Sequence, residues 1–341
     1  VKKENYVGNG AYKLANHIIN EKIEFERNPL YWNDKETVIN SATFLAIENP
    51  STDVARYRAG DLDMTSYALP PEQFAKLQKE LPGEVYITRT LATYSYELNN
   101  KKAPFDNVNI RKALNLSLDR NVITDKVLGQ GQTPTYVFTP TYIEEGQLIQ
   151  QPAYSKEPMA QRNEEAIKLL EEAGYSKANP LKFSILYNTN ENHKKVAIAA
   201  ASMWKANTKG LIDVKLENQE WKTYIDSRRA GRYDAARAGW NADYNQATTF
   251  GNYFLSNSSN NTAKYANPEY DKAIAESYVA TDAEGRAKAY AKAEEILAKD
   301  FGIVPIFNYV NPRLVKPYVK GYSGKDPQDH IYLRNLYIIK H

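Results

Sequence analysis

The feature that most constrains this chain of 341 residues is a strand, a helix and a second strand in direct succession between residues 181 and 221. "LKFSILYN" (181–188) and "LIDVKLENQEW" (211–221) are strand-like, and "HKKVAIAAASMWKANTKG" (193–210) between them has apolar residues at helical spacing. Strands joined through a helix usually pair in parallel, because the helix carries the chain back to the starting edge. The sequence therefore predicts an α/β fold.

Further strands and helices are predicted on both sides of this unit. Before residue 105 the expected elements are a hairpin over 10–28 that bends near Asn20, a strand at 41–48, a helix at 51–64 capped by its Ser-Thr-Asp cluster and closed at Gly60, a helix at 70–81 and a strand at 84–100. After residue 105 they are a helix over 106–129 capped by Asp106, an irregular loop over 130–158, a helix over 160–175 ended by Gly174, a helix at 221–231, a strand at 232–240, helices at 268–279 and 281–300, and a strand at 302–315. The strands at 84–100 and 302–315 are long enough to cross from one domain to another.

Composition excludes several classes of protein. Lys and Arg number 44 against 41 Asp and Glu, and a net charge of +3 is too mild to favour nucleic-acid binding. Hydrophobic residues make up 42% of the chain, which is typical of a globular protein, and no apolar run reaches the length of roughly 18 to 20 residues that a membrane span needs. The chain has no cysteine, so disulfides and thiolate catalysis are impossible.

The residue patterns of known catalytic and metal sites are also missing. The four histidines do not occur at metal-ligand spacing, and the sequence contains neither G-x-S-x-G nor a phosphate-binding loop. The sequence therefore predicts no catalytic residues, no metal and no cofactor.

The stretch "RAGWNADYNQA" (237–247) is the strongest candidate for a binding site, because it leaves a predicted strand where open α/β sheets bind ligands. Asp243 is suited to a ligand ammonium group, and Arg237, Arg228 and His193 are suited to a carboxylate, as charge-assisted hydrogen bonds. Two alternatives stay open at this point. Arg237 and Asp243 could form a structural ion pair with each other, and His193 could be a helix-start residue that contacts solvent.

Several longer stretches resemble one family, the oligopeptide-binding proteins that serve bacterial ABC importers. The matching segments are "NGAYKL", "RYRAGDLDM", "IRKALNLSLDR", "RNEEAIKLLEEAGY", "LYNTNENHKK", "ENQEWKTYIDSR", "ARAGWNADYN", "LSNSSNNTA" and "RLVKPYVKGYSGKDP" with "IYLRNLYIIKH". The resemblance covers essentially the whole chain.

The resemblance implies a two-lobed periplasmic-binding-protein fold of the type II-like class, cluster C. Lobe I would comprise residues 1–90 and 310–341, and lobe II residues 91–309, with hinges near 89–94 and 309–312 that let the lobes close on a ligand. The family's N-terminal third, which holds the start of lobe I and a smaller extra domain, is expected to be missing from this chain.

The resemblance also implies roles for individual residues. Asp243 would receive the α-ammonium group of a peptide. The groups that would meet the peptide C-terminus at different ligand lengths are Arg237, Arg228 and His193. The remaining residues expected to bind the ligand are Trp221, Trp240, Tyr309, Asn241, Ala242 and Tyr94. The family's best-known member has a lysine where Leu128 aligns, and a cysteine pair where Ala92 and Asn241 align, so this chain departs from it at those positions.

The implied function is that of the substrate-binding component of an ABC peptide importer, not of an enzyme. It would bind peptides of about two to five residues or longer, largely through their main chain and therefore independently of sequence. The expected partners are membrane permease subunits, in the periplasm of a Gram-negative bacterium, with the receptor as a monomer that binds no nucleic acid. A murein-tripeptide receptor is the alternative within the class, and a peptide hydrolase or a chaperone-like binder are alternatives outside it.

Overall fold

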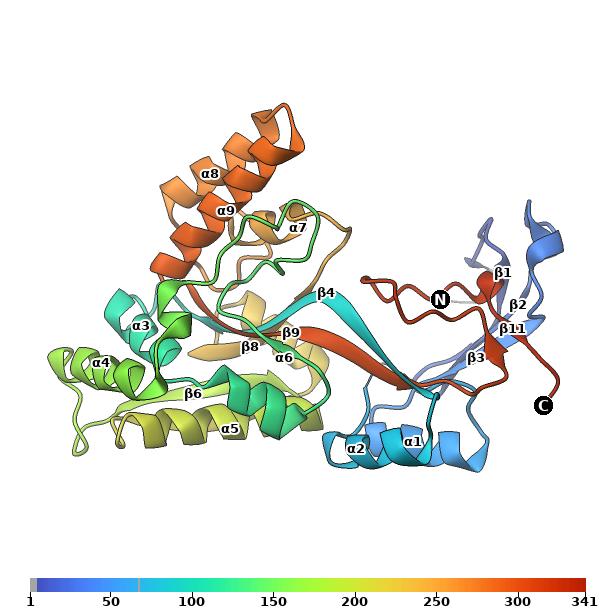
Figure 1. Ribbon diagram of the computed structural model, residues 1–341, viewed down its shortest axis with the longest axis horizontal. Helices are drawn as coiled ribbons and strands as arrows, with labels where there is room; N and C mark the ends of the chain where they lie inside the picture. Colours follow the sequence, from blue (N-terminus) through green and yellow to red (C-terminus); the bar gives the residue numbers. More distant parts are fainter. Residues whose placement is uncertain (1–4, 67) are drawn as a thin grey trace. The chain divides into compact units, whose positions relative to one another are not determined.

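The computed structural model describes residues 5–66 and 68–341, and the chain divides into two compact units (Figure 1). Unit 1 is made of Val1–Arg89 and Asn311–His341, and unit 2 is Thr90–Val310. Both divisions fall inside long strands, which are β4 (Val85–Leu98) and β9 (Ile303–Leu314). Each of these strands therefore belongs in part to each unit.

Unit 1 contains a three-stranded antiparallel sheet in the order β1-β2-β3. Its strands are β1 (Tyr12–Ile18), β2 (Lys22–Arg27) and β3 (Ser41–Leu45), and a second small sheet pairs β10 (Val319–Lys320) with β11 (Tyr337–Ile338). Asn20 has a positive φ of 61° in the turn between β1 and β2, a conformation that asparagine tolerates better than most residues. The predicted hairpin and its bend are confirmed.

Two helices follow in unit 1, α1 (Pro50–Ala59) and α2 (Pro71–Glu80). The predicted Ser-Thr-Asp cap of the first was wrong, because the side chain of Asn49 accepts the hydrogen bonds from the first-turn backbone and Pro50 occupies the first helical position. Asp53 instead accepts hydrogen bonds from the amide and hydroxyl of Ser66. The helix ends, as predicted, at Gly60, whose φ of 88° favours glycine.

Unit 2 is built on a six-stranded sheet in the order β5-β9-β4-β8-β6-β7. Besides β4 and β9, its strands are β5 (Thr133–Pro134), β6 (Leu181–Asn188), β7 (Ile212–Gln219) and β8 (Ala235–Asn241). β6 is parallel to both β7 and β8, and β4 is antiparallel to β8. The predicted parallel pairing around the first strand–helix–strand unit is therefore confirmed, and the carboxyl ends of β6, β7 and β8 share one edge of the sheet.

The helices of unit 2 pack against this sheet and against one another (Figure 1). They are α3 (Val108–Leu116), α4 (Met159–Glu172), α5 (Glu191–Asn207), α6 (Trp221–Arg229), α7 (Thr248–Gly251), α8 (Pro268–Val279) and α9 (Ala283–Lys299). Figure 1 shows α5 alongside β6, and α8 beside α9 as an adjacent pair. Trp204 of α5 is fully buried, and its indole donates to the backbone oxygen of Leu114 at 2.9 Å, so this helix is fixed to the core by packing and by a hydrogen bond.

The single helix predicted over 106–129 was wrong. It is two helices, α3 and a π-helical segment at Val122–Leu128, and its cap is Asn107 instead of Asp106. The interruption has a local cause: the Asp119 carboxylate accepts hydrogen bonds from the amides of Asn121 and Val122, which starts a second helix. Most of the stretch after it, up to residue 158, is irregular, as predicted.

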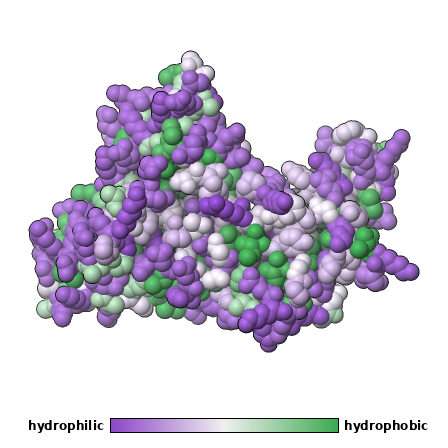
Figure 2. All heavy atoms as spheres, viewed as in Figure 1, coloured by the Kyte–Doolittle hydropathy of each residue, from purple (hydrophilic) through white to green (hydrophobic). Residues whose placement is uncertain are grey.

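The face drawn in Figure 2 is mostly hydrophilic, with hydrophobic residues gathered in small separate patches. Among the helices of the described residues, none combines the length and the apolar character of a membrane span.

Candidate functional site

The candidate site lies on and after β8, where the predicted strand ends and a loop leads into α7. Arg237 lies in this strand opposite Tyr96 of β4, whereas Asp243 lies in the following loop and is exposed. Asn241 ends the strand opposite Ala92, the two positions at which the resemblance places a cysteine pair in another family member. The next residue, Ala242, continues the pairing through an amide that donates to the Leu91 backbone oxygen at 2.8 Å.

Arg237 is held by polar groups from two neighbouring strands. Its guanidinium donates to the Tyr309 hydroxyl of β9 at 2.5 Å and reaches the Asn188 side-chain oxygen, at the end of β6, at 3.5 Å. It also lies 5.1 Å from the centre of the Tyr94 ring, at the distance of a cation–π contact. Burial alone would lower the pKa of Arg237, but the surrounding tyrosines, Tyr309 first, hold that pKa above its ordinary value, so this cation is permanent.

The Nε of Arg237 is buried and has no hydrogen-bond partner within residues 5–66 and 68–341. Among the described residues, the hydrogen bonds of Arg237 go to Asn188 and Tyr309 and none goes to Asp243. The alternative of a structural ion pair between Arg237 and Asp243 is therefore not what this structure contains.

His193 joins the Arg237 cluster from the first turn of α5, whose cap is Asn190. Its ring centre lies 5.5 Å from that of Tyr94, and Tyr94 itself is buried and stacks on Phe307 at 4.7 Å. The Nδ1 of His193 is buried and has no hydrogen-bond partner in the described part of the chain. Burial, and then the nearby Arg237 charge, lower the pKa of His193 well below 6.5. The imidazole is therefore neutral at pH 7, which corrects the cationic role predicted for His193.

The low pKa of His193 predicts how stability changes with pH. The unfolded chain takes up a proton near the ordinary histidine pKa of about 6.5, while the folded protein resists protonation. Stability is therefore expected to fall as the pH drops below about 6.5, by at most about 1.4 kcal/mol per pH unit from this group. The measurement is urea unfolding at pH 7.5 and 5.5 for the wild type and His193→Gln. The variant should show a weaker loss at acid pH, and the exposed His17→Gln should behave like the wild type. Equal pH slopes for the wild type and His193→Gln would contradict this expectation.

Arg228 is already paired within the protein. The side chains of Arg228 and Glu97 are 10% and 1% exposed and form an ion pair at 3.0 Å. The same guanidinium donates to the hydroxyls of Tyr253 and Thr262, and the Tyr253 hydroxyl donates to the other Glu97 oxygen at 2.7 Å. Burial by itself would lower the pKa of Arg228, but Glu97 more than offsets this and holds the pKa well above its ordinary value. In this structure Arg228 has a structural role. Its contact with a ligand carboxylate stays a prediction.

Asp243 and Trp240 are linked by hydrogen bonds to the same residue, Thr249. The Thr249 hydroxyl accepts hydrogen bonds from the Asp243 amide and the Trp240 indole, each at 3.2 Å. Trp240 packs edge-on against Tyr253 at 4.8 Å, so it forms a half-buried wall next to Asp243. Trp221 lies instead at the start of α6, with 54% of its surface exposed, and stacks on Tyr224 at 5.9 Å. Sequence reasoning singled out both tryptophans but missed Thr249, for which no signal beyond its place after the loop was present.

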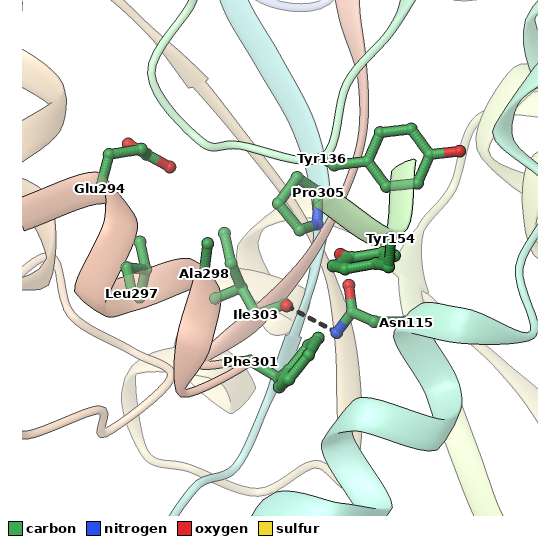
Figure 3. Close-up of a pocket in the computed structure, with 9 residues that line it drawn as sticks. All are labelled: Asn115, Tyr136, Tyr154, Glu294, Leu297, Ala298, Phe301, Ile303 and Pro305. Carbon is green, nitrogen blue, oxygen red and sulfur yellow. Dashed lines mark hydrogen bonds between the residues drawn. The ribbon is translucent and has the colours of Figure 1, made fainter. Parts of the chain in front are cut away.

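An internal cavity of unit 2 is a different feature (Figure 3). It is lined by Asn115, Tyr136, Tyr154, Glu294, Leu297, Ala298, Phe301, Ile303 and Pro305. Its volume is about 10 Å³, which is room for about one water molecule and far too little for a peptide. Asn115 donates to the Ile303 backbone oxygen beside it at 3.0 Å. The cavity includes none of the ten predicted site residues. Within the part of the chain that the structure describes, no three metal-ligating side chains come together.

Comparison with known proteins identifies the family. Residues 1–262 match the bacterial extracellular solute-binding proteins, family 5 (middle region). The chain is 97% identical over 341 residues to the periplasmic oligopeptide-binding protein OppA of Haemophilus influenzae, and 43% identical over 340 residues to the periplasmic murein peptide-binding protein MppA of Escherichia coli. It is fully covered in both matches and spans 63% of the length of each of these relatives.

Solved structures give the same result. All of the chain superposes, with a TM-score of 0.95 and 96% identity, on 66% of Haemophilus influenzae OppA in complex with RPPGFSPFR. It also superposes, with a TM-score of 0.93 and 43% identity, on 66% of the Escherichia coli murein tripeptide binding protein MppA. These matches confirm the predicted fold class and the predicted resemblance. The chain belongs to the bacterial extracellular solute-binding proteins of family 5.

Proposed function

We propose that this chain is the larger part of the substrate-binding component of an ABC peptide importer, and that the intact receptor captures short oligopeptides largely independently of their sequence. The observation that carries the proposal is the 96% identity and TM-score of 0.95 with an oligopeptide-binding protein solved in complex with a peptide.

The geometry of unit 2 supports different ligand contacts for its different charged groups. Asp243, exposed after β8, is suited to an α-ammonium group, and Arg237, with its unpartnered buried Nε, is suited to a carboxylate. His193 is neutral beside Arg237, so its Nδ1 offers a hydrogen bond instead of a charge. The rings of Tyr94 and Tyr309 pack around Arg237 and His193 and would limit the access of water to them.

The cellular setting of the proposed receptor follows from its relatives. The proteins at 97%, 54% and 52% identity are named periplasmic oligopeptide-binding proteins, from Haemophilus influenzae, Salmonella typhimurium and Escherichia coli. We place the receptor in the periplasm of a Gram-negative bacterium, as a monomer that delivers peptides to ABC permease subunits. The hinges near 89–94 and 309–312, in β4 and β9, belong to the same proposal.

Unit 1 supports a further part of this proposal, that the remaining length of the relatives packs against it. Leu30 and Trp32 are 90% and 84% exposed, although apolar side chains of this size are usually buried. Trp32 also lines a surface hollow of about 320 Å³, together with Tyr31 and Arg334 among others. Because the chain spans 63% of its relatives, we propose that the rest of the receptor covers this surface.

A murein tripeptide is the second candidate ligand. It is favoured by the resemblance of the "NENHKK" and "YIDSR" stretches to murein-peptide receptors, and by the TM-score of 0.93 with MppA. We favour ordinary oligopeptides because identity to the named murein-peptide receptor is 43%, against 97% to the named oligopeptide receptor.

Native mass spectrometry of the purified full-length receptor tests the proposal. We expect short peptides of mixed sequence to co-purify with the protein. Peptides incubated with the receptor should be recovered uncleaved. Cleaved peptides would identify a hydrolase instead, and a homogeneous γ-linked murein tripeptide would favour the second candidate. Affinity that is unchanged when the α-amine is blocked would favour a binder of unfolded segments.

The close approach at Gly239 leads to a prediction on binding. A Cβ at this position would lie 2.9 Å from the Arg237 guanidinium nitrogen and 3.1 Å from the Tyr309 hydroxyl, so Gly239→Ala should push the guanidinium aside. We expect this variant to bind a tripeptide about fivefold more weakly by calorimetry, since a misplaced charged hydrogen bond costs about 1 kcal/mol. Gly10→Ala, where a Cβ meets open space, is the control. Wild-type affinity in Gly239→Ala would show that the position of Arg237 does not matter.

A further inference from the structure

Thr249 is one of the residues that attach the loop carrying Asp243 to the rest of unit 2, and its contacts reach Asp243 itself. Its hydroxyl accepts hydrogen bonds from the Asp243 amide and the Trp240 indole at 3.2 Å, and donates to the Asp243 carboxylate at a long 3.5 Å. A hydroxyl has one proton to donate and two lone pairs, so these three contacts use its whole capacity. The residue is 5% exposed, which leaves little surface for direct contact with a ligand.

On its other side, Thr249 is linked through Trp240 to the interior of unit 2. Trp240 packs on Tyr253 at 4.8 Å, and the Tyr253 hydroxyl donates to the buried Glu97 carboxylate at 2.7 Å. Thr249 therefore connects an exposed loop carboxylate to a buried network that reaches into the central sheet. Without the hydroxyl, the Asp243 amide and the Trp240 indole would each lose the acceptor that sets their direction.

We propose that Thr249 is a positioning residue for Asp243, and that its hydroxyl sets how strongly the receptor prefers ligands with a free α-ammonium group. This inference rests on the proposed function, in which Asp243 receives that group. Thr249 does not touch the ligand. It holds the carboxylate in one direction before binding, so that less conformational freedom is lost when the ammonium arrives.

The test compares trialanine with N-acetyl-trialanine by calorimetry in the full-length receptor. Thr249→Val removes the hydroxyl and keeps the shape of the side chain, whereas Thr249→Ser keeps the hydroxyl. We expect Thr249→Val to bind trialanine about fivefold to tenfold more weakly, because the Asp243 carboxylate is no longer held in its direction, with unchanged affinity for the acetylated peptide. Thr249→Ser should recover the preference of the wild type. If Thr249 had only a general structural role, the variant would lose affinity for both peptides equally, and that result would overturn the proposal.

Matched variants separate this inference from the proposed function. Thr248→Val makes the same change one residue earlier, where the hydroxyl contacts Gln246 and Tyr290, and should leave both affinities unchanged. If the wild type prefers trialanine and Thr249→Val keeps that preference, the Thr249 inference is wrong while peptide binding stands. If the wild type binds both peptides with equal affinity, Asp243 does not receive the α-ammonium group, and the inference on Thr249 is wrong as well. Should Thr249→Val fail to fold, Thr249→Ala provides the same comparison.

Discussion

Replacing Glu97 with glutamine is expected to lower the free energy of unfolding by about 3 to 5 kcal/mol. The substitution leaves the Arg228 guanidinium buried without its countercharge, 3.0 Å from a neutral amide in place of a carboxylate. Taking a charge out of water costs several kcal/mol unless an opposite charge compensates it, so most of the loss comes from the arginine that remains. Urea unfolding followed by circular dichroism measures the effect.

The control for this substitution is Glu284→Gln in α9. Glu284 forms an ion pair with Lys288 at 2.7 Å, but the two side chains are 73% and 67% exposed. Exposed pairs of this kind contribute at most about 0.5 kcal/mol, because water already solvates both charges. If the two substitutions lowered the free energy of unfolding equally, the buried Glu97–Arg228 pair would contribute no more to stability than an exposed pair.

Replacing Asp243 with asparagine is expected to lower the affinity of the full-length receptor for a tripeptide by at least tenfold. In the proposed function this carboxylate pairs with the α-ammonium group. Removing one partner of a desolvated charge pair typically costs about 2 to 5 kcal/mol, largely because the other charge stays unpaired. Titration calorimetry with trialanine provides the measurement.

Asp226→Asn is the matched control for that experiment, since it makes the same change of charge at an exposed position on α6. It should leave the affinity within about twofold of the wild type, because exposed charges are screened by salt. Unchanged affinity in Asp243→Asn would remove the ammonium site from the proposal, whatever the other charged groups do.

Local patterns of the sequence predicted much of the secondary structure. Gly60 ends its helix and Asn20 lies in the turn of its hairpin, because each depends on chemistry within a few residues. The parallel pair of β6 and β7 was predicted from the order strand, helix, strand along the chain. The errors were also local and came from competing polar side chains. Asn49 capped a helix in place of the cluster that follows it, and Asp119 started a new helix inside a stretch that reads as one.

The sequence by itself determined the α/β class, and it placed Arg237 in a strand and Asp243 in the loop that follows it, because periodicity and the order of elements can be read along the chain. Tertiary structure decided which charges are engaged inside the protein. Arg228 lies next to Glu97, 131 positions away in the chain, and Arg237 next to Tyr309, 72 positions away. It also decided that His193 is neutral, since a pKa depends on the burial and charges that folding brings to the ring. Contacts between distant strands leave no mark in local patterns, so these roles could only be read from the folded chain.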